Sequence, residues 1–110
     1  MKRGDIILCV IAGDYGKPRP ALIIQSDLFN PTHPSVALLP ITSHLLETPL
    51  FRIPIDKSPG NGLSQPSQIM IDKITAVRRD RIRKRIGQVS PALLIEIEAS
   101  VLRFLGFEGG

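Results

Sequence analysis

Aromatic residues and cysteine are scarce in this 110-residue chain, which has four Phe, one Tyr, no Trp and a single cysteine, Cys9. So few rings argue against a base-stacking platform of the kind that many single-strand binders use. One cysteine cannot form an internal disulfide, which favours a reducing compartment, so the expected location is cytoplasmic. No apolar run is long enough to span a membrane, and no membrane contact is expected.

Metal and cofactor motifs are also missing. The two histidines, the cysteine and the scattered carboxylates lack zinc-ligand spacing, and the sequence has no calcium loop. It has no Gly-rich phosphate loop and no Gly-x-Ser-x-Gly elbow. We therefore expect neither a metal nor a cofactor. Apolar residues make up 43% of the chain, enough for a core of Ile, Leu and Val, and residues 1–110 are expected to form a single domain.

Positive charge is concentrated in one segment. The net charge is +4 and the sequence pI is about 9.7. Half of the basic residues lie in a short window: Lys73, Arg78, Arg79, Arg81, Arg83, Lys84 and Arg85. Such a cluster would attract a polyanion, although a solvated basic turn explains it equally well. Charge alone does not decide between these interpretations.

Short apolar runs separated by Gly, Pro and Asn predict strands rather than helices through residue 77. The predicted strands cover residues 6–11, 21–25, 36–41, 51–55, 68–71, 74–77 and 86–89. The first run is apolar at every position, which indicates burial on both faces. Pro54 cannot donate a hydrogen bond to a neighbouring strand, so the fourth strand is expected at an edge.

The end of the chain has a helical pattern. Ser90 followed by Pro91 is a typical helix start, and Gly106 is a typical stop. The residues expected to face the sheet recur at helical spacing: Leu94, Ile97, Val101 and Leu105. Strands followed by one amphipathic helix predict a mainly β fold with a C-terminal α-helix, built as a small curved sheet or β-barrel.

Two side chains stand out as candidates for chemistry. Arg19 lies between Pro18 and Pro20, which restrict the backbone and could aim the guanidinium at a phosphate. Composition alone favours a simpler role, covering the mouth of a barrel. If the strands form an unbroken meander, the start of the second strand and the end of the third share one rim, which brings Thr42 beside Arg19. The same count brings the loop at residues 13–16, His44 and Asp72 to that rim.

Four blocks in register resemble the MazF/PemK family of toxins. They are RGDI at residues 3–6, PRP at 18–20 followed by an apolar strand, PITS at 40–43 and SQIMIDK at 67–73. Each block is weak alone, but their order and spacing match over nearly the whole chain.

The resemblance implies an SH3-like or CcdB-like barrel with a C-terminal helix, a homodimer and an acidic antitoxin partner. It implies metal-independent, sequence-specific cleavage of single-stranded RNA, mainly mRNA. The matched catalytic pair is Arg19 and Thr42, and Asp72 matches an acidic position that takes part in RNA binding or catalysis in some members. One branch has an arginine where this chain has Met70, and a histidine in the first loop where this chain has none, so that branch's proton transfers do not carry over.

The other candidate RNA contacts surround these positions. They are Asp14, Tyr15, Lys17, Ser43, His44, Ser67, Gln68 and Asp72. His44 is a candidate general base, because histidine is the commonest one, and it is also a plausible incidental surface residue. The loop and strand-entry residues have the same ordinary alternative.

Two other functions fit the general pattern. A CcdB-like toxin shares the expected fold, poisons DNA gyrase and needs no Arg19–Thr42 pair. A non-catalytic SH3-like module would bind nucleic acid or protein, and its binding would survive the loss of Arg19.

Overall fold

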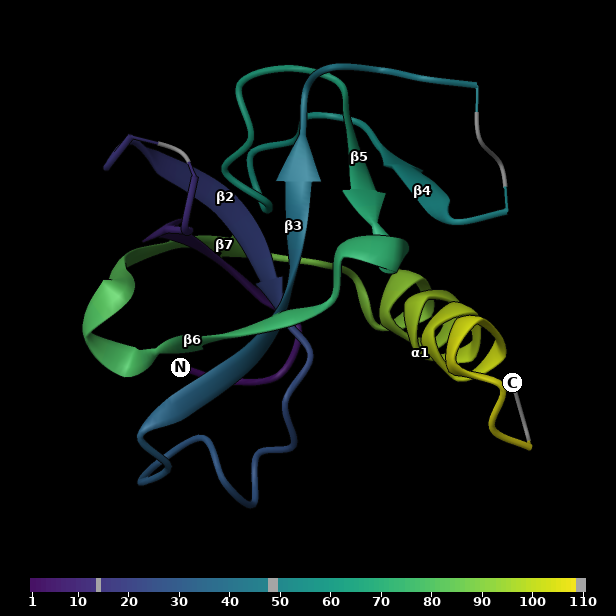
Figure 1. Cartoon of the computed structure of the whole chain (residues 1–110). Coiled ribbons are helices and arrows are strands. Elements are labelled where there is room, and N and C mark those ends of the chain that lie inside the picture. The colour runs from purple at the N-terminus through teal and green to yellow at the C-terminus, as the bar shows by residue number, and fades with distance from the viewer. Residues whose placement is uncertain (14, 48–49, 109–110) are drawn as a thin grey trace.

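Short strands make up most of the chain and one α-helix ends it (Figure 1). The computed structural model describes all residues except 14, 48–49 and 109–110. Its elements are β1 (Asp5–Val10), β2 (Pro18–Ile23), β3 (Ser35–Thr42), β4 (Arg52–Ile55), β5 (Ser67–Met70), the 3-10 turn η1 (Ile71–Lys73), β6 (Thr75–Arg78), the 3-10 turn η2 (Arg79–Arg81), β7 (Ile82–Gln88) and α1 (Pro91–Leu105). The predicted fold class, mainly β with a C-terminal helix, is confirmed.

The strands form one antiparallel sheet with the order β4-β5-β3-β2-β1-β7, and β6 also pairs with β3. β5 therefore lies between β3 and β4, and the connection from β3 to β4 passes beyond β5. The expected unbroken meander is wrong at this point, because β5 runs antiparallel to β3 rather than in the same direction. β4 is at one end of the sheet, as Pro54 predicted.

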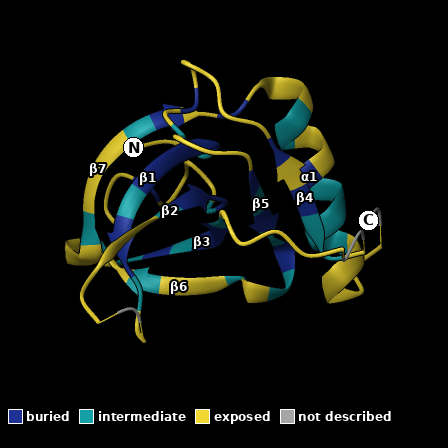
Figure 2. Cartoon of the chain, turned by 90° about the horizontal axis from the view of Figure 1, so that it is seen from above, coloured by how far each residue is buried: buried dark blue, intermediate teal, exposed yellow. Residues whose placement is uncertain are grey.

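The sheet is curved so strongly that both faces of β1, β2 and β3 are covered (Figure 2). One core cluster contains Ile6, Leu22, Leu39 and Ile97 and lies under α1. A second, which contains Ile7, Cys9 and Ala21, lies on the opposite face. Neighbouring residues of β1 thus point into different cores, which confirms that this strand is buried on both sides.

The helix begins and ends where the sequence predicts. The Ser90 side chain accepts a hydrogen bond from the backbone N–H of Leu93 at 3.1 Å, and Gly106 ends the helix in the left-handed conformation (φ 80°). Ile97 is fully buried, and Leu94 and Val101 pack partly buried against the same core. The prediction for Leu105 is wrong, since this residue lies in the last turn and is 46% exposed. Within the described residues, no helix is long and apolar enough to cross a membrane.

β7 is longer than predicted and extends into the basic window. It starts at Ile82 instead of residue 86 and pairs with β1, with two register shifts along the way. Arg83, Lys84 and Arg85 therefore lie exposed on a strand and not in a turn.

The connection between β4 and β5, residues 56–66, bridges the open side of the sheet. In the described chain β4 and β7 do not pair, so the sheet does not close into a complete barrel. The N–H of Gln88 donates to the carbonyl of Gly60 at 3.0 Å. A Cβ on Gly62 would lie 2.2 Å from the Ile86 carbonyl oxygen, and one on Gly87 would lie 2.3 Å from the Asn61 carbonyl carbon. The two backbones meet directly, which only glycine allows at these positions.

Candidate active site

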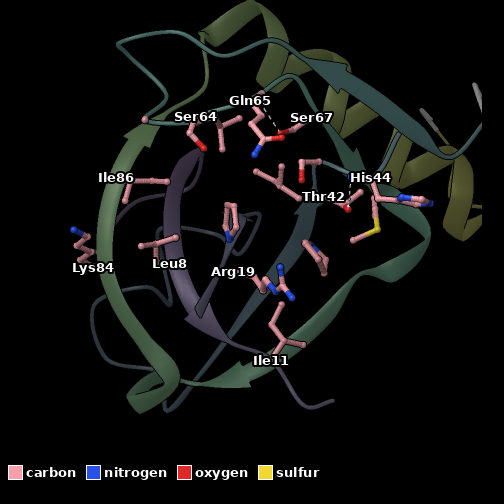
Figure 3. A pocket seen from close by; sticks show the side chains of 17 residues that line it. Leu8, Ile11, Arg19, Thr42, His44, Ser64, Gln65, Ser67, Lys84 and Ile86 are labelled. Atoms are coloured by element: carbon pink, nitrogen blue, oxygen red, sulfur yellow. Dashed lines mark hydrogen bonds between the residues drawn. The ribbon is translucent and has the colours of Figure 1, made fainter. Parts of the chain in front are cut away.

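A groove of about 630 Å³ opens at the rim where β1 ends, β2 begins and β3 ends (Figure 3). Its apolar surface comes from Leu8, Ile11, Pro20, Pro40, Ile41, Leu63, Met70 and Ile86. Its polar side chains are Arg19, Thr42, Ser43, His44, Ser64, Gln65, Ser67 and Lys84. A lining that combines apolar side chains with a few polar ones is typical of sites that bind small organic groups.

Strand register brings Arg19 and Thr42 together. β2 and β3 pair with Ala21 opposite Pro40, and continuing that register by two residues places Arg19 opposite Thr42. Both residues line the groove. The structure therefore places Arg19 and Thr42 at the same groove, as the expected order of the second and third strands predicts.

The Arg19 guanidinium is presented from a stiff, exposed stretch of β2. Arg19 pairs with Cys9 of β1, and both its neighbours in sequence are prolines with restricted backbones. Its guanidinium offers a planar fork of donors that suits phosphate oxygens. The groove thus has a positioned cation at the start of β2.

The Thr42 hydroxyl keeps its proton available for a ligand. Its Oγ1 accepts a hydrogen bond from the backbone N–H of His44 at 3.0 Å. A hydroxyl that accepts one bond can still donate another. Ser43 and His44 follow along the groove, but Figure 3 shows the His44 ring pointing away from Arg19.

Ser67 lies in the groove, whereas Gln68 does not. Ser67 is buried and its Oγ donates to the Gln65 carbonyl at 2.9 Å. The Gln68 side chain exchanges two hydrogen bonds with the Leu46 backbone and accepts a third from Arg52 Nη1 at 2.9 Å. Gln68 therefore anchors the connection between β3 and β4.

The prediction that Asp72 shares the rim is wrong. Thr42 pairs with Gln68, at the start of β5, so the end of β5 lies away from the Thr42 end of β3. Met70, the last residue of β5, still lines the groove, but Asp72 does not. Asp72 lies beyond the other end of β5, in η1. It is half-buried, and its Oδ1 has no hydrogen-bond partner among the described residues.

The predicted RNA-contact residues of the first loop lie outside the groove or outside the described residues. Asp14 lies outside the described residues. Tyr15 has a positive φ of 52° and is fully exposed, and Lys17 is exposed as well. Neither residue is among those that line the groove.

Much of the basic window is engaged elsewhere. Arg85 pairs with the buried Asp5 at 3.1 Å, and Arg78 pairs with Asp80 at 2.8 Å. Arg79 donates to the carbonyls of Asn30 and His33, which holds the loop before β3. Of this window, only Lys84 lines the groove. Residues 1–13, 15–47 and 50–108 contain no group of three His, Cys, Asp or Glu side chains that could hold a metal.

Sequence reasoning missed the side of the groove opposite Arg19. Gly62, Leu63, Ser64 and Gln65 come from the connection between β4 and β5, and Ile86 comes from β7. Their sequence has the ordinary composition of a turn, and only the three-dimensional contact with β7 brings them to the groove. The close approach of Gly62 to Ile86 and of Gly87 to Asn61 could not be found from local sequence.

Comparison with known proteins agrees with this geometry. Residues 2–105 match the family described as PemK-like, MazF-like toxin of type II toxin-antitoxin system. The chain belongs to this family. The resemblance of the four sequence blocks is therefore confirmed. The chain is 43% identical to the probable endoribonuclease MazF of Mycolicibacterium smegmatis, over 99% of this chain and 100% of the relative. It is 24% identical to endoribonuclease EndoA of Bacillus subtilis, over 92% and 90% of the two chains.

Solved structures of toxins share the fold. Mycobacterium tuberculosis toxin MazF-mt6 superimposes with a TM-score of 0.81 at 21% identity, covering 94% of this chain and 98% of that one. An endoribonuclease in complex with its cognate antitoxin, from a mycobacterial species, superimposes with a TM-score of 0.79 at 20% identity, covering 100% and 99%. The curved sheet with its terminal helix is thus the fold of MazF toxins.

Proposed function

We propose that this toxin is a metal-independent endoribonuclease that cuts single-stranded mRNA at specific sequences in the cytoplasm. The observation that carries this proposal is that Arg19 and Thr42, on the paired strands β2 and β3, line the same groove. Family membership and the names of relatives, endoribonuclease MazF and endoribonuclease EndoA, support the same activity. They favour it over gyrase poisoning and over a non-catalytic SH3-like module.

The chemistry follows from the two side chains. The 2′-hydroxyl oxygen of one nucleotide attacks its own 3′ phosphorus, and the bond from phosphorus to the next 5′ oxygen breaks. The products are a 2′,3′-cyclic phosphate and a 5′-hydroxyl, so one proton leaves the 2′-oxygen and one is taken up by the 5′ oxygen. Negative charge grows on the non-bridging oxygens during attack. Arg19 and the Thr42 hydroxyl stabilise that charge as preorganised donors.

We assign no general-base role to His44, because its ring points away from Arg19. Arginine is a poor base because it holds its proton. The roles proposed for Arg19 and Thr42 are therefore binding and charge stabilisation.

The direct test is incubation of the purified protein with a long RNA in excess EDTA, with the new ends mapped. We expect cleavage to continue and to leave 5′-hydroxyl ends. Activity that disappears in EDTA and returns with magnesium or zinc would contradict the mechanism. An assay of gyrase supercoiling in parallel is expected to show no inhibition.

We also propose two protein partners. One is an acidic antitoxin that covers the groove, in line with the net charge of +4 and with a structural neighbour determined with its cognate antitoxin. Its binding should weaken as salt rises.

The other proposed partner is a second copy of the chain. It is supported by the large apolar side chains Phe104, Leu105 and Phe107, which are exposed near the end of α1. Sedimentation equilibrium should give twice the monomer mass.

A further inference from the structure

The loop that faces Arg19 is held rigidly, although it has no regular secondary structure. Asn61, which is only 6% exposed, organises its turn. Asn61 Nδ2 donates to the Asp56 carbonyl at 2.8 Å, and its Oδ1 accepts from the N–H groups of Ser58 and Leu63 at 3.1 and 3.0 Å. The backbone contact of Gly62 with β7 fixes the loop against the sheet. Side chains that follow this turn are therefore preorganised.

Gln65 is the residue that this rigid loop presents to the groove. Its backbone carbonyl is held by Ser67 Oγ at 2.9 Å, but its side-chain amide makes no hydrogen bond within the described part of the chain. Gln65 and the neighbouring Ser64 are both exposed and line the groove. Figure 3 shows the two side chains on the opposite side of the groove from Arg19.

The surface next to Gln65 is apolar. Leu8 and Ile86 line the groove beside Ser64 (Figure 3), and Pro20, the neighbour of Arg19 in sequence, also lines it. A nucleobase has an apolar face and an edge of donors and acceptors, so it needs both kinds of surface. A volume of about 630 Å³ accommodates such a ring beside a phosphate.

We propose that Gln65, assisted by Ser64, recognises the edge of a nucleobase next to the phosphate that is cut. The base face packs on Leu8 and Ile86, while its edge pairs with the Gln65 amide, which offers one donor and one acceptor. Arg19 holds the neighbouring phosphate. This inference rests on the proposed ribonuclease function and assigns part of its sequence specificity to one residue.

The variant Gln65→Glu gives the sharpest test, because it keeps the shape and replaces the donor by an acceptor. Guanine has two adjacent donors on its Watson–Crick edge, and the other three bases do not. We therefore expect the variant to shift the preferred base at one position beside the cut towards guanine. A good bidentate pair discriminates on the order of tenfold or more, which sets the size of the shift.

Added negative charge lowers RNA affinity at every sequence, so the readout is the relative rate among sites. Gln88→Glu makes the same chemical change on an exposed residue outside the groove and is the matched control. Wild type and both variants are incubated with a long mixed-sequence RNA, and the ends are sequenced. We expect Gln88→Glu to keep the wild-type base preferences. Relative rates for Gln65→Glu within twofold of wild type at all sites would overturn the proposal.

A binding experiment separates this inference from the cleavage itself. RNA oligonucleotides with 2′-fluoro groups lack the attacking hydroxyl, so affinity can be measured by anisotropy without cleavage. One position at a time carries each of the four bases. Gln65→Met, which removes both polar groups, should lose base discrimination at a single position. If wild type discriminates in this way but cuts no RNA, the base site stands and the ribonuclease function falls. If wild type cuts RNA and Gln65→Met discriminates as wild type does, the base site falls.

Discussion

Arg19 and Thr42 stand on neighbouring strands, whereas Ser64 and Gln65 stand on a loop without regular hydrogen bonding. On the first side, the register of β2 and β3 sets the distance between the two groups. On the second, the buried Asn61 and the close backbone approach of Gly62 to Ile86 and of Gly87 to Asn61 hold the residues in place. Substitutions at Arg19 or Thr42 should therefore leave the fold intact, whereas the loop that carries Ser64 and Gln65 depends on a few tight contacts.

The largest expected effect is on the strand side, where Arg19→Ala should reduce cleavage on the order of 100-fold or more. The substitution removes the cation that stabilises the developing charge. Thermal stability should hardly change, because Arg19 is exposed. Single-turnover cleavage rates and melting curves measure the two quantities. Arg19→Lys should recover only part of the loss, since it lacks the planar fork. If lysine performs like arginine, charge alone suffices and the two-pronged contact is wrong.

Thr42→Ala should cost less than Arg19→Ala, because a neutral donor is lost instead of a charged one. The loss should still be clear in the single-turnover rate. Thr42→Ser keeps the hydroxyl and is the matched control, with a rate close to wild type. Equal rates for the alanine and serine variants would show that the hydroxyl takes no part.

On the loop side, Gly87→Ala should lower the free energy of unfolding by about 1–3 kcal/mol, as overpacking commonly does. Its new Cβ would lie 2.3 Å from the Asn61 backbone. Urea unfolding measures the change. Gly60→Ala in the same loop is the control, since its Cβ would have only Ser58 Oγ nearby, at 4.0 Å, and the effect should stay within about 0.5 kcal/mol. Similar stability for both variants would mean that the contact with β7 does not hold the loop.

The smallest effect concerns Asp27, which lies in neither side of the groove. The backbone N–H of Arg3, followed by the Asn30 amide, lowers the pKa of the Asp27 carboxyl. A lowered pKa in the folded state adds stability above about pH 4, and that stability is lost as the pH falls through the folded value. The contribution should be a few tenths of a kcal/mol, because the carboxyl is exposed.

Urea unfolding of wild type and Asp27→Asn at pH 6 and pH 3 measures this contribution. The difference between the two proteins should shrink at pH 3. Glu96→Gln, on the exposed face of α1, is the control for replacing a surface carboxyl by an amide. Cleavage should be unchanged in both variants. A stability difference that grows in acid would reverse the sign assigned to Asp27.

Local sequence was sufficient for the elements and for the strand side of the groove. Alternation and breakers located every strand within a few residues, and Ser90 and Gly106 marked the helix ends. Arg19 and Thr42 could be placed together because they lie on consecutive strands. Asp72 could not, because the insertion of β5 between β3 and β4 is a non-local choice. The place of Gln65 in the groove depends on the backbone approach of Gly62 to Ile86 and of Gly87 to Asn61. These residues are more than 20 positions apart, and a single sequence offers no signal for such a contact.

The pairing of β1 with β7 has a consequence for synthesis of the protein. β1 is the first strand to be synthesised and β7 is the last. The edge of β1 that pairs with β7 therefore stays without its partner until Gln88 has been made. The groove is also incomplete until then, because Ile86 is the last of its lining residues to be synthesised. The loop at residues 58–62 packs against the backbone of Ile86 and Gly87, so it has no partner before these residues are made. Long-range pairing of this kind makes folding late and cooperative. A nascent chain that already contains Arg19 and Thr42 therefore lacks the side of the groove that the loop and β7 supply. The ribosome that makes this toxin translates most of its message before a finished site exists.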